Sequence, residues 1–190
     1  MVEITEAPLT SLDEYAQVPI AFEVESVLEV SVREGGLAGF DLEERRIAPF
    51  VKDYDAIVGN HPSDWAKRFD VSTWGLITAR VEGRRLGGTV VAFDATDVVM
   101  LEGRRDLALI WDIRVDRDVR RHGVGSALFA AAERWAKARG CRWLKVETQN
   151  INVPACRFYS RQGCTLGAIH RFAYPDLPGE VQLLWYKDIA

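Results

Sequence analysis

A stretch rich in arginine and glycine, residues 120–126, constrains the fold of this chain more than any other feature. The residues before it, 107–115, are mostly apolar, which is typical of a buried β-strand. After it, apolar residues recur at helical spacing and predict a helix from about Gly123 to Arg139. Unpaired N–H groups at such a helix start attract anions, and glycines let a phosphate approach the backbone. The stretch therefore predicts a site for a phosphorylated cofactor.

Two other glycine-rich phosphate-binding motifs fit the sequence less well. A nucleoside-triphosphate-binding loop needs a lysine near its end, but the candidate segment over residues 83–89 contains no lysine. The dinucleotide-binding motif needs a third glycine where Leu128 stands. Glu147 does lie near the position of the ribose-binding acid of that fold, but strands and helices do not alternate regularly. A dinucleotide-binding fold stays the less favoured alternative.

Two motifs in the second half of the chain resemble those of the GNAT superfamily of acyl-CoA-dependent N-acetyltransferases. The first is Arg120-x-x-Gly123-x-Gly125, directly after the apolar strand. The second is Asn152-x-x-Ala155-x-x-Phe158-Tyr159-x-x-x-Gly163. The chain departs from the family pattern at Cys164, where an aromatic residue is common. The order and separation of the two motifs make the resemblance specific.

One branch of that superfamily is more similar still. Residues 147–152, the pair at 155–156 and the late segment 184–186 resemble the streptothricin acetyltransferases. The resemblance covers residues 74–187 well and the first seventy residues poorly. It implies a single α/β domain over residues 1–190, with a mixed, mostly antiparallel sheet flanked by helices. The central pair of strands is expected to splay apart.

The resemblance also implies acetyl-CoA as the co-substrate and no metal. The backbone of the central strand is expected to pair with the pantetheine arm, and the amides of residues 121–126 with the pyrophosphate. Three basic side chains add positive charge there, while Asn152 both caps the following helix and contacts the cofactor. The expected cofactor-binding residues are Ile113, Val115, Arg120, Arg121, His122, Gly123, Val124, Gly125, Ser126 and Asn152.

Tyr159 is the expected general acid, because the family places that group at this position of the second motif. Coenzyme A leaves as a thiolate, and a phenol can protonate or hydrogen-bond the leaving sulfur. The alternative is that Tyr159 is a core tyrosine.

Two carboxylates are candidates for the base that an attacking amine needs. Asp112 interrupts an apolar strand, where a buried acid is costly unless it is paired or used in catalysis. Its other interpretation is an ion pair with Arg114 or another arginine. Glu147 lies on the neighbouring strand and is the second candidate. The sequence slightly favours Asp112.

Composition limits the classes of protein to which the chain can belong. With 190 residues, 48% of them hydrophobic, it can form a substantial core. A net charge of −4 argues against nucleic acid as the main partner. The three cysteines form neither a zinc nor a disulfide pattern, and Cys156 is expected to be a core residue rather than a nucleophile. No segment can span a bilayer, so a cytoplasmic protein is expected.

The remaining segments complete the predicted order of strands and helices. Ser11 and Glu14 have the spacing of a capping box, and residues 20–32 alternate like a half-exposed strand. Residues 40–69 are hardest to interpret. Leu42, Ile47 and Phe50 have the spacing of one side of a helix, and a short second helix is predicted over residues 65–69. The clearer strands are expected at residues 74–81, 86–93, 142–148, 165–170 and 181–187, with a helix over residues 153–161.

The expected reaction is transfer of acetyl from acetyl-CoA to a primary amine by direct attack. The acceptor is expected to be small and cationic, with a streptothricin-type antibiotic as one candidate. Acetylation of a protein N-terminus or lysine, or acyl-CoA sensing without turnover, are the alternatives. A homodimer is a further expectation from the resemblance.

Overall fold

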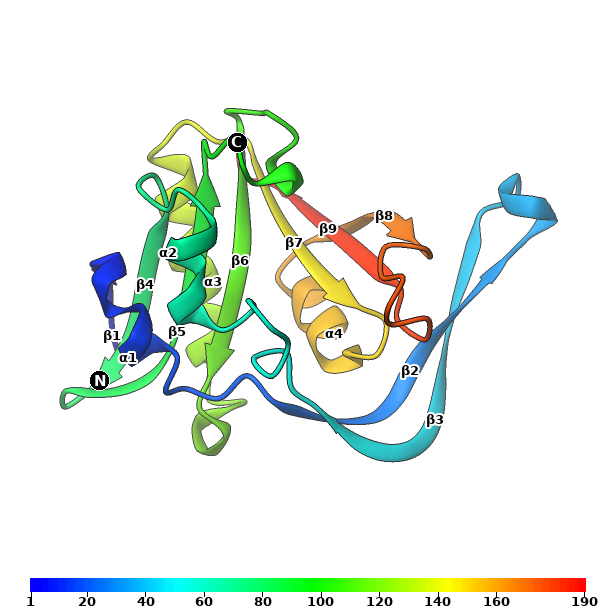
Figure 1. Cartoon of the computed structure of the whole chain (residues 1–190), viewed down its shortest axis with the longest axis horizontal. Coiled ribbons are helices and arrows are strands. Elements are labelled where there is room, and N and C mark those ends of the chain that lie inside the picture. Colours follow the sequence, from blue (N-terminus) through cyan, green and yellow to red (C-terminus); the bar gives the residue numbers. More distant parts are fainter. The chain divides into compact units, whose positions relative to one another are not determined.

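The computed structural model describes all residues from 1 to 190 (Figure 1). Its strands are β1 (Glu3–Ala7), β2 (Phe22–Val32), β3 (Phe40–Lys52), β4 (Gly75–Val81), β5 (Arg84–Phe93), β6 (Leu107–Val115), β7 (Trp143–Gln149), β8 (Thr165–His170) and β9 (Gln182–Asp188). Its α-helices are α1 (Leu12–Tyr15), α2 (Pro62–Arg68), α3 (Val124–Lys137) and α4 (Val153–Arg161). The bounds predicted for β6, β8 and α4 are confirmed to the residue.

The chain divides into two compact units, and the first comprises residues 1–21, 53–146 and 187–190. Its strands lie in the order β1-β4-β5-β6-β7. Neighbours from β1 to β6 are antiparallel, whereas β6 and β7 are parallel. This arrangement is the mixed, mostly antiparallel sheet that was predicted.

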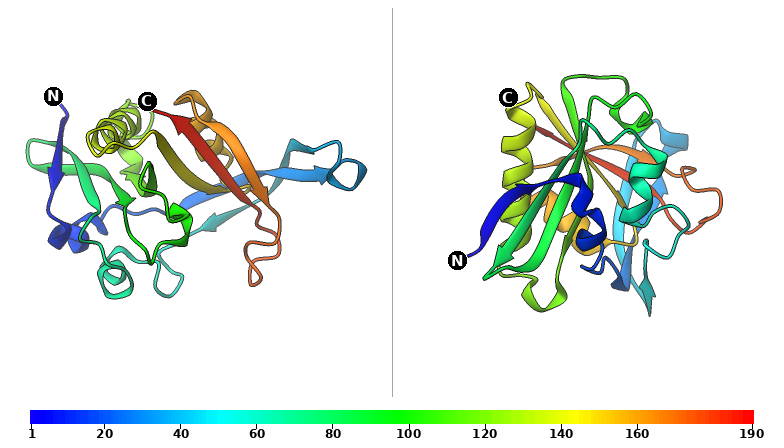
Figure 2. Two further views of the ribbon diagram at one scale, coloured as in Figure 1. Left: turned by 90° about the horizontal axis from the view of Figure 1, so that it is seen from above. Right: turned by 60° about the vertical axis from the view of Figure 1, so that its left-hand side comes forward.

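Helices cover both faces of this part of the sheet (Figure 2). Helix α3 packs its apolar side on β4, β5 and β6. The packing is close, because a Cβ on Gly75 of β4 would come within 2.4 Å of the Trp135 ring of α3. On the opposite face, Tyr15 of α1 and Trp65 of α2 join Trp74 and apolar residues of β4–β6 in one buried cluster.

The central strand β6 is irregular where the candidate site begins. Opposite β5, Val90 pairs with Asp112 and Val91 with Ile110, so Trp111 forms a β-bulge. Opposite β7, the parallel ladder ends at the pair Ile110 and Val146. The last five residues of β6 therefore lie beyond its ladder with β7, as expected for a strand of a splayed central pair.

The second unit comprises residues 22–52 and 147–186. Strands β2 and β3 form a long antiparallel hairpin, and β8 pairs antiparallel with β9. Asn150, which directly follows β7, connects these parts: it exchanges backbone and side-chain hydrogen bonds with Leu28 and Val181 at 2.8–3.0 Å. A single buried amide thus fixes β2 against the start of the segment that leads into β9.

The structure corrects two predictions for the N-terminal third and adds one strand that was not predicted. Residues 40–52 form strand β3 and not a helix, because β2 offers a long antiparallel ladder with a single register shift and because Pro49 disfavours a helix interior. Pro49 lies in the register shift of β3, where no ladder hydrogen bond is lost. Ser11 makes no capping hydrogen bond to α1, and β1 was not predicted. None of the helices is both long and apolar enough to cross a membrane.

Candidate active site

The loop between β6 and α3 has the local geometry of an anion-binding helix start. Gly123 has φ +84°, which glycine adopts without strain, and α3 begins at the next residue. The first hydrogen bond of the helix runs from Ala127 N–H to Gly123 O at 3.0 Å, so the N–H groups before it lie outside the helical ladder. A Cβ on Gly123 would meet no atom within 4 Å. The exposed backbone at this loop fits a phosphate-bearing ligand.

The three basic residues before Gly123 differ in their surroundings. Arg120 is half-buried, and its Nε donates to the Val115 carbonyl at 3.0 Å. It therefore ties the loop back to the end of β6 at Val115, a residue whose backbone was predicted to pair with the pantetheine arm. Arg121 and His122 are exposed, with the His122 Nδ1 3.0 Å from the Arg120 carbonyl. The exposed positive charge lies next to the start of α3.

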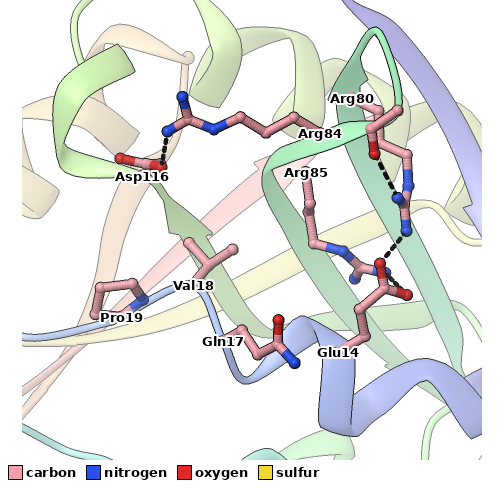
Figure 3. Close-up of a pocket in the computed structure, with 9 residues that line it drawn as sticks. Glu14, Gln17, Val18, Pro19, Arg80, Arg84, Arg85 and Asp116 are labelled. Atoms are coloured by element: carbon pink, nitrogen blue, oxygen red, sulfur yellow. Dashed lines mark hydrogen bonds and ion pairs between the residues drawn. The ribbon is translucent and has the colours of Figure 1, made fainter.

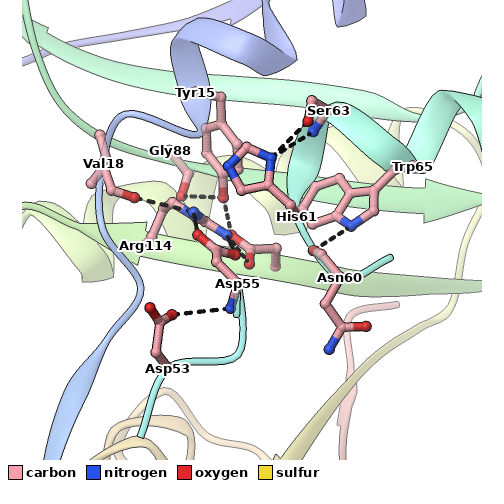
Figure 4. Close-up of polar contacts among 11 residues, drawn as sticks. Tyr15, Val18, Asp53, Asp55, Asn60, His61, Ser63, Trp65, Gly88 and Arg114 are labelled. Atoms are coloured by element: carbon pink, nitrogen blue, oxygen red, sulfur yellow. Dashed lines mark hydrogen bonds and ion pairs between the residues drawn. The ribbon is translucent and has the colours of Figure 1, made fainter. Parts of the chain in front are cut away.

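Arg114 is the centre of a buried ionic network (Figure 4). Asp112 belongs to this network. Its Oδ1 accepts from Arg114 Nε at 2.9 Å and from the Tyr15 hydroxyl, and its Oδ2 accepts from Arg114 Nη2 at 2.8 Å. Arg114 also pairs with Asp55 at 2.8 and 3.1 Å and donates to the Val18 carbonyl at 3.1 Å. The ion pair with Arg114, one of the two interpretations of Asp112, is present.

Burial and neighbouring charges keep the Tyr15 hydroxyl and the Arg114 guanidinium protonated. Burial raises the pKa of the Tyr15 hydroxyl, and the charge of Asp112 raises it further, so Tyr15 remains a donor. Burial lowers the pKa of Arg114, but the charge of Asp112 and hydrogen bonds to Asp112 and Asp55 outweigh it, and the pKa lies above its usual range. The network holds β6 to residues 15–18 and 53–55. Neither Tyr15 nor Asp55 carries a sequence signal, since each lies far along the chain from Asp112.

Glu147, in the second unit, has a different environment. Its Oε1 accepts from Gln149 Nε2 at 3.0 Å and from the Tyr174 hydroxyl, and its Oε2 accepts from Gln182 Nε2 at 2.7 Å. Burial and the charge of Glu147 raise the pKa of Tyr174 well above its usual range, so this hydroxyl stays a donor. All three donors are neutral, so Glu147 has no cationic partner among these hydrogen bonds. Tyr174 was not predicted from the sequence.

The second motif forms α4. Asn152 is its N-cap, and the side-chain oxygen accepts from the Ala155 N–H at 3.2 Å, as predicted. Tyr159 is 4% exposed, and its ring lies 5.1 Å from that of Phe158. Burial raises the pKa of the Cys156 thiol, which lies 3.4 Å from Thr148 Oγ1. A buried neutral thiol is a poor nucleophile, in agreement with its expected place in the core.

The predicted site residues are thus distributed over both units. Asp112, the backbone of Ile113 and Val115, and the loop over residues 120–126 belong to the first unit, while Glu147, Asn152 and Tyr159 belong to the second. No group of three or more histidine, cysteine or acidic side chains has the arrangement of a metal site.

The chain is similar to known acetyltransferases in sequence and in fold. Residues 41–164 match the Acetyltransferase (GNAT) family. Streptothricin acetyltransferase of Escherichia coli is 30% identical over 169 residues, which cover 87% of this chain and 84% of that protein. Streptothricin acetyltransferase A of Bacillus subtilis (strain 168) is 42% identical over 81 residues, 42% of this chain and 47% of that protein. A structure from Bacillus anthracis str. Ames, assigned as a streptothricin acetyltransferase in complex with acetyl coenzyme A, has a TM-score of 0.75, 26% identity and coverage of 99% of each chain.

The family match includes both motifs that the sequence indicated, the glycine-rich loop and the segment from Asn152 to Gly163. The relative from Escherichia coli matches over most of both chains. The prediction of an acetyltransferase with an α/β fold is confirmed, and the dinucleotide-binding alternative is set aside. The chain belongs to the GNAT family of acetyltransferases.

Proposed function

We propose that this enzyme transfers acetyl from acetyl-CoA to a primary amine of a small cationic acceptor of the streptothricin type. The observation that carries the proposal is the likeness to the streptothricin acetyltransferase of Escherichia coli over 87% of this chain. The carboxylate of Glu147, with its neutral hydrogen-bond donors, supports a cationic acceptor, because it attracts an ammonium group without competition from a paired arginine.

Acetyl-CoA supplies the acetyl thioester. The loop over residues 121–126 is proposed to bind its pyrophosphate through backbone N–H groups, with Arg121 and His122 adding positive charge. Arg120 is proposed to hold this loop in place through the Val115 carbonyl. Asn152 and the backbone of Ile113 are proposed to contact the pantetheine arm.

Glu147 is proposed to take the proton of the attacking amine. The amine is mostly protonated near pH 7, and only the neutral form attacks a thioester. Asp112 is the less suitable carboxylate, because both of its oxygens accept hydrogen bonds from the cationic Arg114, whereas the hydrogen-bond donors to Glu147 are neutral. We therefore assign Asp112 a positioning role, which reverses the slight preference from the sequence.

Tyr159 is proposed to donate a proton or a hydrogen bond to the departing sulfur of coenzyme A. A phenol has a reference pKa of about 10, which makes it a suitable donor to a thiolate. The change Tyr159→Phe is then expected to lower kcat while the Kd for coenzyme A changes little. An unchanged kcat would remove this role.

The test of the function is acetyl-CoA turnover, followed as free thiol release, with streptothricin, polyamines, aminoglycosides and lysine-containing peptides as acceptors. Streptothricin is expected to give the highest kcat/KM, and a sensitive host that expresses the chain is expected to grow on it. Turnover with a peptide alone would favour a protein acetyltransferase. Binding of acetyl-CoA without any turnover would favour the sensor.

The two carboxylates are distinguished by their amide variants. Glu147→Gln is expected to lower kcat about 100-fold or more, the scale of general base catalysis. Asp112→Asn is expected to change thermal stability more than kcat. The reverse order would restore Asp112 as the base.

The cytoplasmic location and the homodimer stay predictions. Light scattering after size-exclusion chromatography tests the dimer.

A further inference from the structure

The first unit contains a pocket that none of the proposed catalytic or cofactor-binding residues line (Figure 3). It has a volume of about 260 Å³ and lies at the turn between β4 and β5, the end of α1 and the residue that follows β6. The lining residues are Glu14, Gln17, Val18, Pro19, Arg80, Gly83, Arg84, Arg85 and Asp116.

Two of the three lining arginines have their charge compensated. Arg80 Nη2 lies 2.5 Å from Glu14 Oε1, and its Nη1 donates to the Gly83 carbonyl at 2.9 Å. Arg84 Nη2 donates to Asp116 Oδ2 at 2.8 Å. These pairs use the two carboxylates that line the pocket, so three cations face two anions.

The third arginine, Arg85, is the one that is not fully paired. Its side chain is 6% exposed, and its Nη2 forms an ion pair at 2.9 Å with Glu14, a carboxylate that it shares with Arg80. Its Nε and Nη1 are buried and have no hydrogen-bond acceptor. Figure 3 shows this guanidinium among Glu14, Gln17 and Val18.

A buried charged donor without an acceptor is unfavourable, and an anion with two or more oxygens would satisfy it. Burial lowers the pKa of Arg85, in keeping with a cation that lacks full compensation, although Glu14 raises it. The pocket has room for a few non-hydrogen atoms beside the guanidinium. It therefore has both the space and the excess positive charge for a small anion.

We propose that this pocket is a second ligand site that binds a small oxyanion, a carboxylate or a phosphate group, on Arg85. The bound oxyanion accepts hydrogen bonds from Nε and Nη1 and joins the segment of residues 14–19 to the β4–β5 turn. The site is separate from acetyl transfer, and the proposal does not depend on the acceptor amine.

The test measures the melting temperature of the full chain against increasing sodium phosphate, sodium acetate or sodium malonate. Ionic strength is held constant with sodium chloride, and coenzyme A is present at saturation so that the phosphate-binding loop is already filled. At least one anion is expected to raise the melting temperature in a saturable manner. A response to phosphate alone, or to carboxylates alone, identifies the group that the pocket takes.

Arg85→Gln is expected to weaken this binding about tenfold or more, since it removes the charged donors. Arg105→Gln is the matched control, because Arg105 also pairs with one acid, Asp94 at 2.8 Å, but is 80% exposed and lies outside the pocket. The Arg105→Gln variant is expected to bind the anion with the same affinity as the unchanged protein. If Arg85→Gln does not fold, Arg85→Lys, which lacks Nε and the planar fork, is expected to show the same weakening.

Two results would overturn the proposal. One is that no anion has a saturable effect on the unchanged protein. The other is an equal response in the unchanged protein and in the folded Arg85 variant.

Discussion

Arg114→Met is the sharpest test of the ionic network around β6. The guanidinium makes five hydrogen bonds, two to Asp112, two to Asp55 and one to the Val18 carbonyl. The side chains of Arg114, Asp112 and Asp55 are 0%, 6% and 16% exposed. Methionine fills a similar volume but leaves two carboxylates without their cation. Removing one partner of a buried ion pair lowers the free energy of unfolding by about 3–5 kcal/mol. Because Asp55 is partly exposed, we expect a loss of about 4 kcal/mol for Arg114→Met.

That loss corresponds to a fall in melting temperature of about 8–16 °C for a chain of this length, to be measured by calorimetry and urea unfolding at pH 7. Arg142→Met is the matched control, because Arg142 is 60% exposed and pairs with Asp188 at 3.1 Å. It is expected to cost less than about 1 kcal/mol. Adding Asp112→Asn and Asp55→Asn to Arg114→Met is expected to recover about 2 kcal/mol, since both unpaired charges are removed. A loss below about 1 kcal/mol for Arg114→Met would refute the reasoning.

Three further predictions concern glycine and cysteine positions. Gly75→Ala is expected to cost about 1–3 kcal/mol, because the new Cβ would meet the Trp135 ring at 2.4 Å; an unchanged urea midpoint would contradict this. Gly123→Ala is expected to lower the free energy of unfolding by about 1 kcal/mol, because Gly123 has a positive φ, and to weaken coenzyme A binding in calorimetric titration. Gly83→Ala is the control: Gly83 has φ +81°, so its loss of stability should be similar, but coenzyme A binding should not change. Burial raises the pKa of Cys141 from 9.0 to about 11, so stability should fall as pH rises from 9 to 11, where the unfolded thiol ionises first. Cys141→Ala should flatten that part of the pH profile, and an identical slope in both proteins would count against it.

Local sequence predicted those parts of the fold in which one segment carries its own pattern. Strand β6 and helix α4 have the predicted bounds, because an apolar run in one case and an N-cap followed by Pro154 in the other are local signals. Strand β3 was not predicted. Its apolar residues also fit helical spacing, and only its ladder with β2 decides between the two structures.

Some residues of the candidate site were likewise predicted from local sequence, and others were not. The glycine-rich loop and Asn152 were found from sequence, since each acts through its own backbone and its place at a helix start. Tyr174 and Tyr15 were not, because each acts through a carboxylate 27 or 97 residues away along the chain. Spacing contains no information about such contacts.

The sequence alone therefore determined the family, the reaction class and the position of the glycine-rich loop that is proposed to bind the pyrophosphate, because these depend on motifs that are contiguous in the chain. Only the tertiary structure decided the surroundings of the two candidate bases. Asp112 and Glu147 are both acids in mostly apolar or mixed strands, and the sequence around them gave only a slight preference for Asp112 as the base. Folding places Asp112 against the cation of Arg114 and Glu147 among neutral donors. The charge that a carboxylate presents to a ligand depends on such neighbours, which are brought close only when distant segments pack together.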